Sequence, residues 1–236
     1  MPSTLSRDST GCQGMDELLS GGLPADRLHV VSGPPGSGKT TFSAQFITEG
    51  ARRGEECVYV TMHETKAELV QDMSGFQFGF EKAIRSSNTT FLDLTEESAR
   101  QSLTKYGSAG GLRNRLPAML AGLDADRAVI DSTMLLDHFV DNPEEALTDF
   151  ITRLKGTETT ILLVSEMTDP TAYAEEHYLA HGVVFFHNYL DGGGMTRAVQ
   201  PIKMRGTPIN SDMRPIEFTD RGVQVYPDQD LESTYG

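Results

Sequence analysis

One nine-residue stretch constrains the fold of this chain more than any other feature. Residues 33–41 have the form G-x-x-x-x-G-K-[ST], the phosphate-binding loop or P-loop. The stretch consists of Gly33, Pro34, Pro35, Gly36, Ser37, Gly38, Lys39, Thr40 and Thr41. Its glycines allow successive backbone amides to point at a β-phosphate, Lys39 reaches the β- and γ-phosphates, and Thr40 ligates Mg²⁺. The sequence therefore predicts a site for a nucleoside triphosphate.

The flanking residues supply the setting that a P-loop requires. An apolar run at 28–31 predicts a buried strand directly upstream. Downstream, Phe42, Phe46 and Ile47 recur at helical spacing within residues 41–53. The helix start adds a positive dipole end to the phosphate site. Strand, loop and helix follow in the order of an α/β nucleotide-binding unit.

The remaining chain predicts an α/β P-loop NTPase fold whose central sheet is mostly parallel and flanked by helices. Apolar, β-branched runs predict buried parallel strands, and helical patterns lie between them. The predicted strands are 57–62, 91–94, 127–131 and 159–165. The predicted helices are a short one within 14–24 that is closed by glycine, and 65–73, 112–123 and 143–154. Turn signals at 191–194 and 220–222 predict two hairpins, which extend the sheet with antiparallel strands at its C-terminal edge.

Length and sequence pattern predict one domain over residues 1–227 and an acidic tail over 228–236. The formal charge is −14, with 34 acidic residues against 20 basic ones, of which only six are lysine. This balance fits a high-salt cytoplasm or an ordinary acidic protein, and it argues against a protein that coats DNA. Cys12 and Cys57 fit no metal spacing and suit a reducing compartment. No secretion signal or 18-residue apolar stretch occurs, so we expect a cytoplasmic protein without a membrane span.

Three acidic residues are candidates for chemistry at the phosphates. Asp131 ends a buried strand, and we predict that it holds Mg²⁺ together with Thr40, although such an aspartate can also cap a turn. Glu64 follows the strand at 57–62, and it is the candidate base that activates water or, alternatively, an acid favoured by a helix N-terminus. Glu166 follows the strand at 159–165, where it senses the γ-phosphate, supports Mg²⁺ or is purely structural.

Five segments in order resemble the KaiC family within the RecA-like ATPases, and the likeness runs from about residue 10 to residue 227. The segments are residues 14–24, the P-loop at 33–41, the strand at 57–62 with Glu64 and Thr65, residues 130–132, and residues 203–207. The resemblance implies a homo-oligomeric ring, usually of six subunits, that binds ATP and Mg²⁺ between neighbours. It also implies that Lys203 and Arg205 reach the γ-phosphate held by the next subunit, as an arginine finger does. The residues alone favour solvated charges on an edge strand at these two positions.

Two departures from the family pattern bear on activity. Many members have two adjacent acids after the second strand, whereas this chain has His63 and Glu64, so we expect slow hydrolysis. Residues 178–184 lack the adjacent serine and threonine of the clock protein's second domain, so an autokinase cycle is not supported. We expect a slow regulatory ATPase with an unidentified protein partner. The alternatives are a non-catalytic ATP-dependent adaptor, a DNA-binding recombinase relative and a small-molecule kinase.

Overall fold

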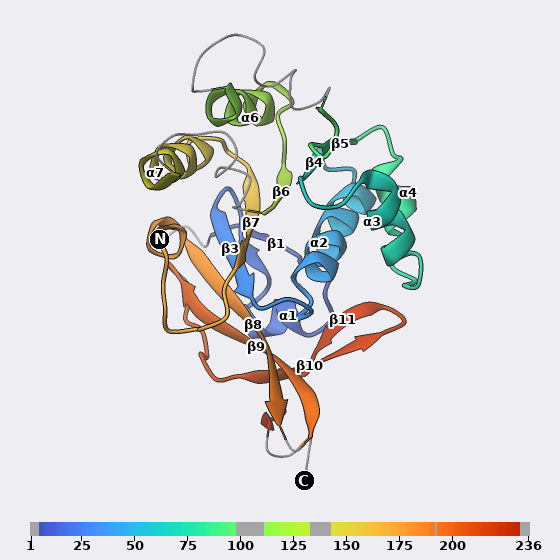
Figure 1. The fold of residues 1–236 in the computed structure, drawn as a ribbon, viewed down its shortest axis with the longest axis vertical. Coiled ribbons are helices and arrows are strands. Elements are labelled where there is room, and N and C mark those ends of the chain that lie inside the picture. The colour runs from blue at the N-terminus through green and yellow to red at the C-terminus, as the bar shows by residue number, and fades with distance from the viewer. Residues whose placement is uncertain (1–4, 98–110, 133–142, 192, 232–236) are drawn as a thin grey trace.

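The computed structural model describes residues 5–97, 111–132, 143–191 and 193–231, and its central feature is a nine-stranded sheet (Figure 1). The strand order is β11-β10-β9-β8-β3-β7-β6-β4-β5. The strands are β3 (Leu28–Gly33), β4 (Cys57–Thr61), β5 (Thr89–Asp93), β6 (Arg127–Asp131), β7 (Thr160–Glu166), β8 (Gly182–Asp191), β9 (Gly194–Met204), β10 (Arg214–Thr219) and β11 (Gly222–Val225). Pairing is parallel from β8 to β5 and antiparallel from β8 to β11, which confirms the predicted mixed sheet.

Helices cover both faces of this sheet because its inner strands are apolar on both sides. One buried cluster contains Val31, together with apolar side chains from α1 (Met15–Leu18), α2 (Lys39–Arg53), α3 (Lys66–Met73) and α4 (Phe80–Ile84). The other contains Val30, together with side chains from α6 (Gly111–Gly122), α7 (Pro143–Leu154) and α8 (Glu175–Leu179). Figure 1 shows α2, α3 and α4 on one side of the strands and α6 and α7 on the other. The layers hold the strand ends, and the loops on them, in fixed positions.

Local sequence sets where the two helices nearest the site begin. Helix α2 follows Gly38, which has a φ of 108°. Glycine adopts positive φ at low energetic cost, so the chain can turn sharply from the P-loop into the helix. Helix α3 begins with a capping box, in which Thr65 caps the backbone of Glu68 and the Glu68 carboxylate accepts from the Thr65 amide. This box orients the segment that carries Glu64.

Two short N-terminal strands and two short helices are elements that the sequence analysis does not predict. A two-stranded sheet joins β1 (Arg7–Asp8) to β2 (Leu23–Pro24), and Arg7 donates to the carbonyl oxygens of Leu19 and Gly22. Periodicity cannot predict strands of two residues or the five-residue helices α4 and α8, because such segments are too short to show a repeat. Tertiary contacts stabilise elements of this length. In the predicted tail, Asp230 forms an ion pair with Arg214, and residues 232–236 lie outside the described part of the chain.

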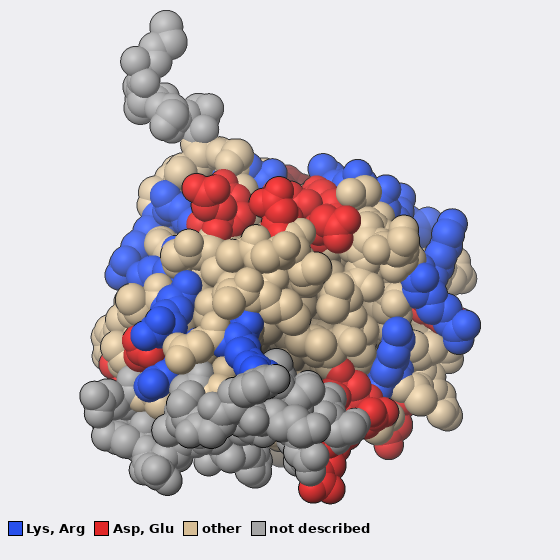
Figure 2. All heavy atoms as spheres, turned by 90° about the horizontal axis from the view of Figure 1, so that it is seen from above, with Lys and Arg blue, Asp and Glu red and all other residues tan. Residues whose placement is uncertain are grey.

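Several surface and burial features bear on the function classes. Within the described residues, no helix has the length and apolar character needed to cross a bilayer. On the face shown in Figure 2, Asp and Glu gather at the upper centre and lower right, Lys and Arg lie mainly towards the left and right margins, and uncharged residues lie between them. Cys12 and Cys57 are buried free thiols, and burial raises the pKa of Cys57 to about 12. A buried thiol of this kind is a poor nucleophile at neutral pH.

Candidate nucleotide site

The predicted site residues meet at the carboxyl edge of the parallel strands. The register pairs Gly33 with Glu166 across β3 and β7. It pairs Asp131 with Val164 across β6 and β7, and Thr61 with Asp131 across β4 and β6. The ends of four neighbouring strands therefore bring the P-loop and the three candidate acids to one edge, which is where open α/β sheets bind ligands.

Lys39 lies at the centre of this edge, with only 5% of its side chain exposed. Its ammonium donates to the carbonyl oxygens of Gly33 at 2.8 Å and Pro34 at 3.0 Å. It also forms an ion pair with Glu166 at 3.1 Å. A lysine ammonium has three donors, so these three oxygens hold the side chain within the loop.

The backbone of the P-loop packs closely against its neighbours. A β-carbon built on Gly33 would lie 2.1 Å from the carbonyl oxygen of Phe186 in β8, so only glycine fits there. The hydroxyl of Ser37 is buried and has no partner among the described side chains and backbone groups. A buried polar atom without a partner is costly, and a phosphate oxygen would satisfy this one. This arrangement suits an anion bound in the loop.

Asp131 and Thr40 form the pair of oxygens predicted to hold Mg²⁺. The Thr40 hydroxyl donates to Asp131 Oδ2 at 3.2 Å, so helix α2 and strand β6 present their oxygens to the same point. Burial raises the pKa of Asp131, and this effect outweighs the opposing hydrogen bond from Thr40 and the charge of Lys39. Hydroxyl and carboxylate oxygens suit Mg²⁺, which takes few protein ligands when phosphates supply others. The residues therefore fit the ion.

Glu64 lies beside this pair, just beyond the end of β4. Burial raises its pKa, and the charge of Asp131 raises it further. A carboxylate with a raised pKa is a stronger base, so these surroundings suit proton abstraction from water. The neighbouring His63 places Nε2 3.3 Å from the hydroxyl of Ser132, directly after Asp131. His63 thus contacts the segment that carries the candidate metal ligand.

A hollow of about 320 Å³ opens directly over the P-loop. It is lined by Pro35, Gly36, Gly38, Lys39, Thr40, Thr41, Glu166 and Phe218. Phe218 comes from β10, and its ring lies 5.1 Å from the guanidinium of Arg197. Phe218 is not predicted from the sequence, because an aromatic residue beside a hairpin turn carries no signal for a ligand site. Its position beside the loop makes it available to a nucleotide base.

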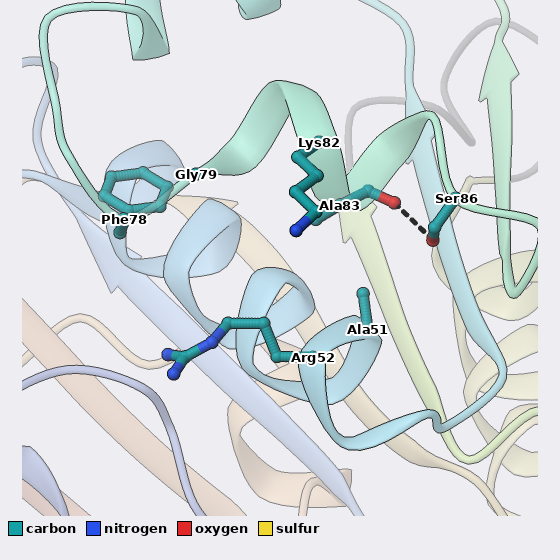
Figure 3. A pocket seen from close by; sticks show the side chains of 7 residues that line it. All are labelled: Ala51, Arg52, Phe78, Gly79, Lys82, Ala83 and Ser86. Carbon is teal, nitrogen blue, oxygen red and sulfur yellow. Dashed lines mark hydrogen bonds between the residues drawn. The ribbon is translucent and has the colours of Figure 1, made fainter.

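A larger hollow, of about 520 Å³, lies at the other end of α2 (Figure 3). Arg52 and Lys82 line it from α2 and α4, and Phe78 contributes a ring beside them. Lys39 and Arg52 stand near opposite ends of a 15-residue helix, so about 20 Å separates this hollow from the P-loop. The larger hollow is therefore distinct from the phosphate site.

Lys203 and Arg205 do not lie at the P-loop edge of their own chain. Lys203 pairs with Val183, which pairs with Val30, so it lies about 10 Å along the strand direction from Gly33. Its ammonium donates to the carbonyl oxygens of His177 at 3.0 Å and Tyr178 at 2.9 Å, and Arg205 donates to that of Tyr178 at 3.2 Å. Both cations are thus held at the end of α8.

Comparisons with known proteins agree over nearly the whole chain. Residues 9–230 match a family model described as the KaiC ATPase. The circadian clock oscillator protein KaiC of Parathermosynechococcus lividus is 28% identical over 231 residues, which cover 94% of this chain and 43% of that protein. A UPF0273 protein of Thermotoga maritima is 32% identical over 239 residues, which cover 95% of this chain and 98% of that protein.

A solved structure agrees with these sequence matches. The crystal structure of a KaiC-like protein from Pyrococcus horikoshii matches with a TM-score of 0.81 at 28% identity, covering 95% of this chain and all of that one. The chain therefore spans less than half the length of the clock proteins it matches and nearly the full length of the UPF0273 protein.

Proposed function

The chain belongs to the KaiC family of ATPases, and from this premise we propose that it binds ATP with Mg²⁺ at the P-loop and hydrolyses it slowly at the subunit interfaces of a homo-oligomeric ring. The observation that carries the proposal is the meeting of Lys39, Thr40, Asp131 and Glu64 at one sheet edge, described above. We further propose a ring of six subunits, a regulatory role in the cytoplasm and an unidentified protein partner.

Each residue at this edge has a separate role in the proposed reaction. Lys39 exchanges its carbonyl and Glu166 partners for phosphate oxygens, and the curled loop backbone donates to the β-phosphate. Thr40 and Asp131 hold Mg²⁺, which neutralises charge that develops on the phosphates. Glu64 accepts a proton from the attacking water, and its raised pKa supports this role. Phe218 provides an aromatic surface next to the loop for the base.

Lys203, on β9, and Arg205, directly after that strand, act on the neighbouring subunit in this proposal. Their hydrogen bonds to α8, and the distance of Lys203 from Gly33 along the strand direction, support a role outside their own P-loop. A cation that reaches the γ-phosphate across an interface stabilises the charge of the departing phosphoryl group, an effect of roughly a thousandfold or more. Isolated subunits are then poor ATPases.

Phosphate release and oligomeric mass, measured with and without Mg·ATP, test the proposal. Lys39→Ala abolishes nucleotide binding, whereas Glu64→Gln retains binding and loses turnover. Glu17→Gln is the matched control, because this carboxylate is exposed on α1. Unchanged turnover in Glu64→Gln would show that the base is wrongly assigned. An assembled, nucleotide-loaded ring that releases no phosphate would favour the adaptor instead.

Mixing two inactive variants tests the role in trans. Lys39→Ala lacks a working loop, and Lys203→Ala/Arg205→Ala lacks the donated cations. Mixed rings contain some interfaces with one intact loop and one intact cation pair, so activity partly returns. No recovery in rings shown by mass to be mixed would contradict donation across the interface. Lys82→Ala, an exposed lysine on α4, is the matched control for the loss of charge.

A further inference from the structure

Helix α8 carries two buried polar side chains that no step of the proposed reaction uses. Glu176 and His177 are only 5% and 3% exposed. Glu176 Oε1 accepts a hydrogen bond from the Ser165 hydroxyl at 2.6 Å, and His177 Nε2 lies 2.6 Å from the Ser32 hydroxyl. A helix of five residues is not stable through its own backbone hydrogen bonds, so these buried side-chain hydrogen bonds fix α8 against β3 and β7.

The tautomer of His177 makes its contact with Ser32 directional. The backbone amide of Ala174 donates to His177 Nδ1 at 3.0 Å, and the Ala174 carbonyl oxygen lies 3.3 Å from the same nitrogen. The shorter contact uses the lone pair of Nδ1, which assigns the hydrogen of the neutral ring to Nε2 and makes Nε2 the donor to Ser32. Burial lowers the pKa of His177, which agrees with a neutral ring. Ser32 therefore accepts one hydrogen bond from α8, through His177. Ser165 donates one hydrogen bond to α8, through Glu176.

The two serines directly precede the groups that hold Lys39. Ser32 is followed by Gly33, whose carbonyl oxygen accepts from the Lys39 ammonium at 2.8 Å. Ser165 is followed by Glu166, whose carboxylate pairs with the same ammonium at 3.1 Å. Phosphate oxygens compete for these ammonium protons, so nucleotide binding acts on the two strand ends to which α8 is attached.

The backbone of α8 holds Lys203, on β9, and Arg205, directly after that strand. The carbonyl oxygens of His177 and Tyr178 accept from Lys203, and that of Tyr178 also accepts from Arg205. Burial lowers the pKa of Lys203, and the nearby positive charge of Arg205 lowers it further. Two like charges held side by side depend on these carbonyl oxygens, so the position of α8 sets the position of both cations.

We propose that Glu176 and His177 are positioning residues that attach α8 to the strand ends at the P-loop. Through them, α8 couples the nucleotide state of that P-loop to the placement of Lys203 and Arg205, which the same subunit presents to its neighbour. This proposal rests on the proposed function, in which the two cations act on the γ-phosphate bound by the neighbouring subunit. The contacts that transmit it lie wholly within one chain. Binding at one site then alters the next site in the ring without any direct contact between the two nucleotides.

Hydrogen exchange of the backbone over residues 200–206, measured with and without Mg·ADP, tests this coupling. The experiment uses conditions in which light scattering gives the same oligomeric mass with and without Mg·ADP, so that a change of assembly cannot cause the change in exchange. ADP binding is measured separately by titration. In the wild-type protein, ADP changes exchange in this segment by about fivefold, the factor that corresponds to one hydrogen bond. In His177→Leu the change disappears although ADP still binds. His177→Gln, which keeps a polar atom near the position of Nε2, restores it.

A second pair of variants covers the case in which His177→Leu does not fold. Ser165→Ala removes one hydroxyl that bonds to α8 and also abolishes the response. Ser43→Ala is the matched control, because Ser43 is equally buried and its hydroxyl has no partner among the described residues. A wild-type segment that ignores bound ADP, or an equal response in His177→Leu or Ser165→Ala, overturns the coupling. Failure of ADP to bind the wild-type protein overturns the proposed function instead.

Discussion

Gly33→Ala is the substitution whose effect the structure defines most sharply. Gly33 ends β3 with a φ of 150°, a conformation that alanine rarely adopts, and a β-carbon there would lie 2.1 Å from the carbonyl oxygen of Phe186. Both atoms belong to paired strands, so neither can move without disturbing the ladder between β3 and β8. Gly36, in the same loop, has a φ of 72°, and its nearest contact is a side-chain atom of Asn188 at 3.4 Å.

The two substitutions differ in cost for this reason. A left-handed alanine costs about 1–2 kcal/mol, which is the whole effect expected at Gly36. At Gly33 the clash with β8 adds an overpacking cost of about 1–3 kcal/mol, so the total is roughly 2–5 kcal/mol. In a chain of this size each kcal/mol lowers the Tm by about 2–4 °C, so we expect losses of roughly 10 °C for Gly33→Ala and roughly 4 °C for Gly36→Ala.

Urea denaturation and thermal unfolding of the nucleotide-free proteins measure both effects. Gly122→Ala is the matched control, because a β-carbon at Gly122 meets nothing within 4 Å and no unusual φ occurs there. A Gly33→Ala protein that is no less stable than Gly36→Ala would contradict the expected clash with β8. That result would mean that β8 does not approach the loop as closely as described.

Two further predictions concern charge and pH. Burial raises the pKa of Asp131, so its ionised carboxylate destabilises the nucleotide-free fold at neutral pH. Asp131→Asn should therefore raise the urea midpoint of the nucleotide-free protein and remove the extra stabilisation that Mg²⁺ adds to bound ATP. A lowered urea midpoint would contradict this account. Burial lowers the pKa of His29 to about 4, so the unfolded state binds more protons and stability is lost as the pH falls from 6.5 towards 4. His29→Gln should lose about 3 kcal/mol less than the wild-type protein between pH 7 and pH 4, and parallel pH profiles would contradict the buried neutral ring.

The sequence by itself determined the P-loop, the type of sheet and most of its strands. These features depend on local chemistry: a glycine-rich loop before Lys39, apolar β-branched runs, and turn residues between antiparallel strands. The family resemblance also follows from short ordered segments, and the comparisons confirm it. The predicted roles of Asp131, Glu64, Lys203 and Arg205 remain proposals for the experiments above.

Only the tertiary structure decided how distant residues meet. Register across β3 and β7 brings Glu166 to Lys39, and no spacing in the sequence encodes that ion pair. Phe218 reaches the loop from a hairpin near the end of the chain. The hydrogen bonds of α8 connect the serines of two strands to Lys203 on a third strand and to Arg205 just beyond it. A helix of five residues is too short to be predicted from periodicity. Sequence patterns report which elements form because that choice is local, whereas contacts between elements depend on packing, which joins residues far apart in the chain.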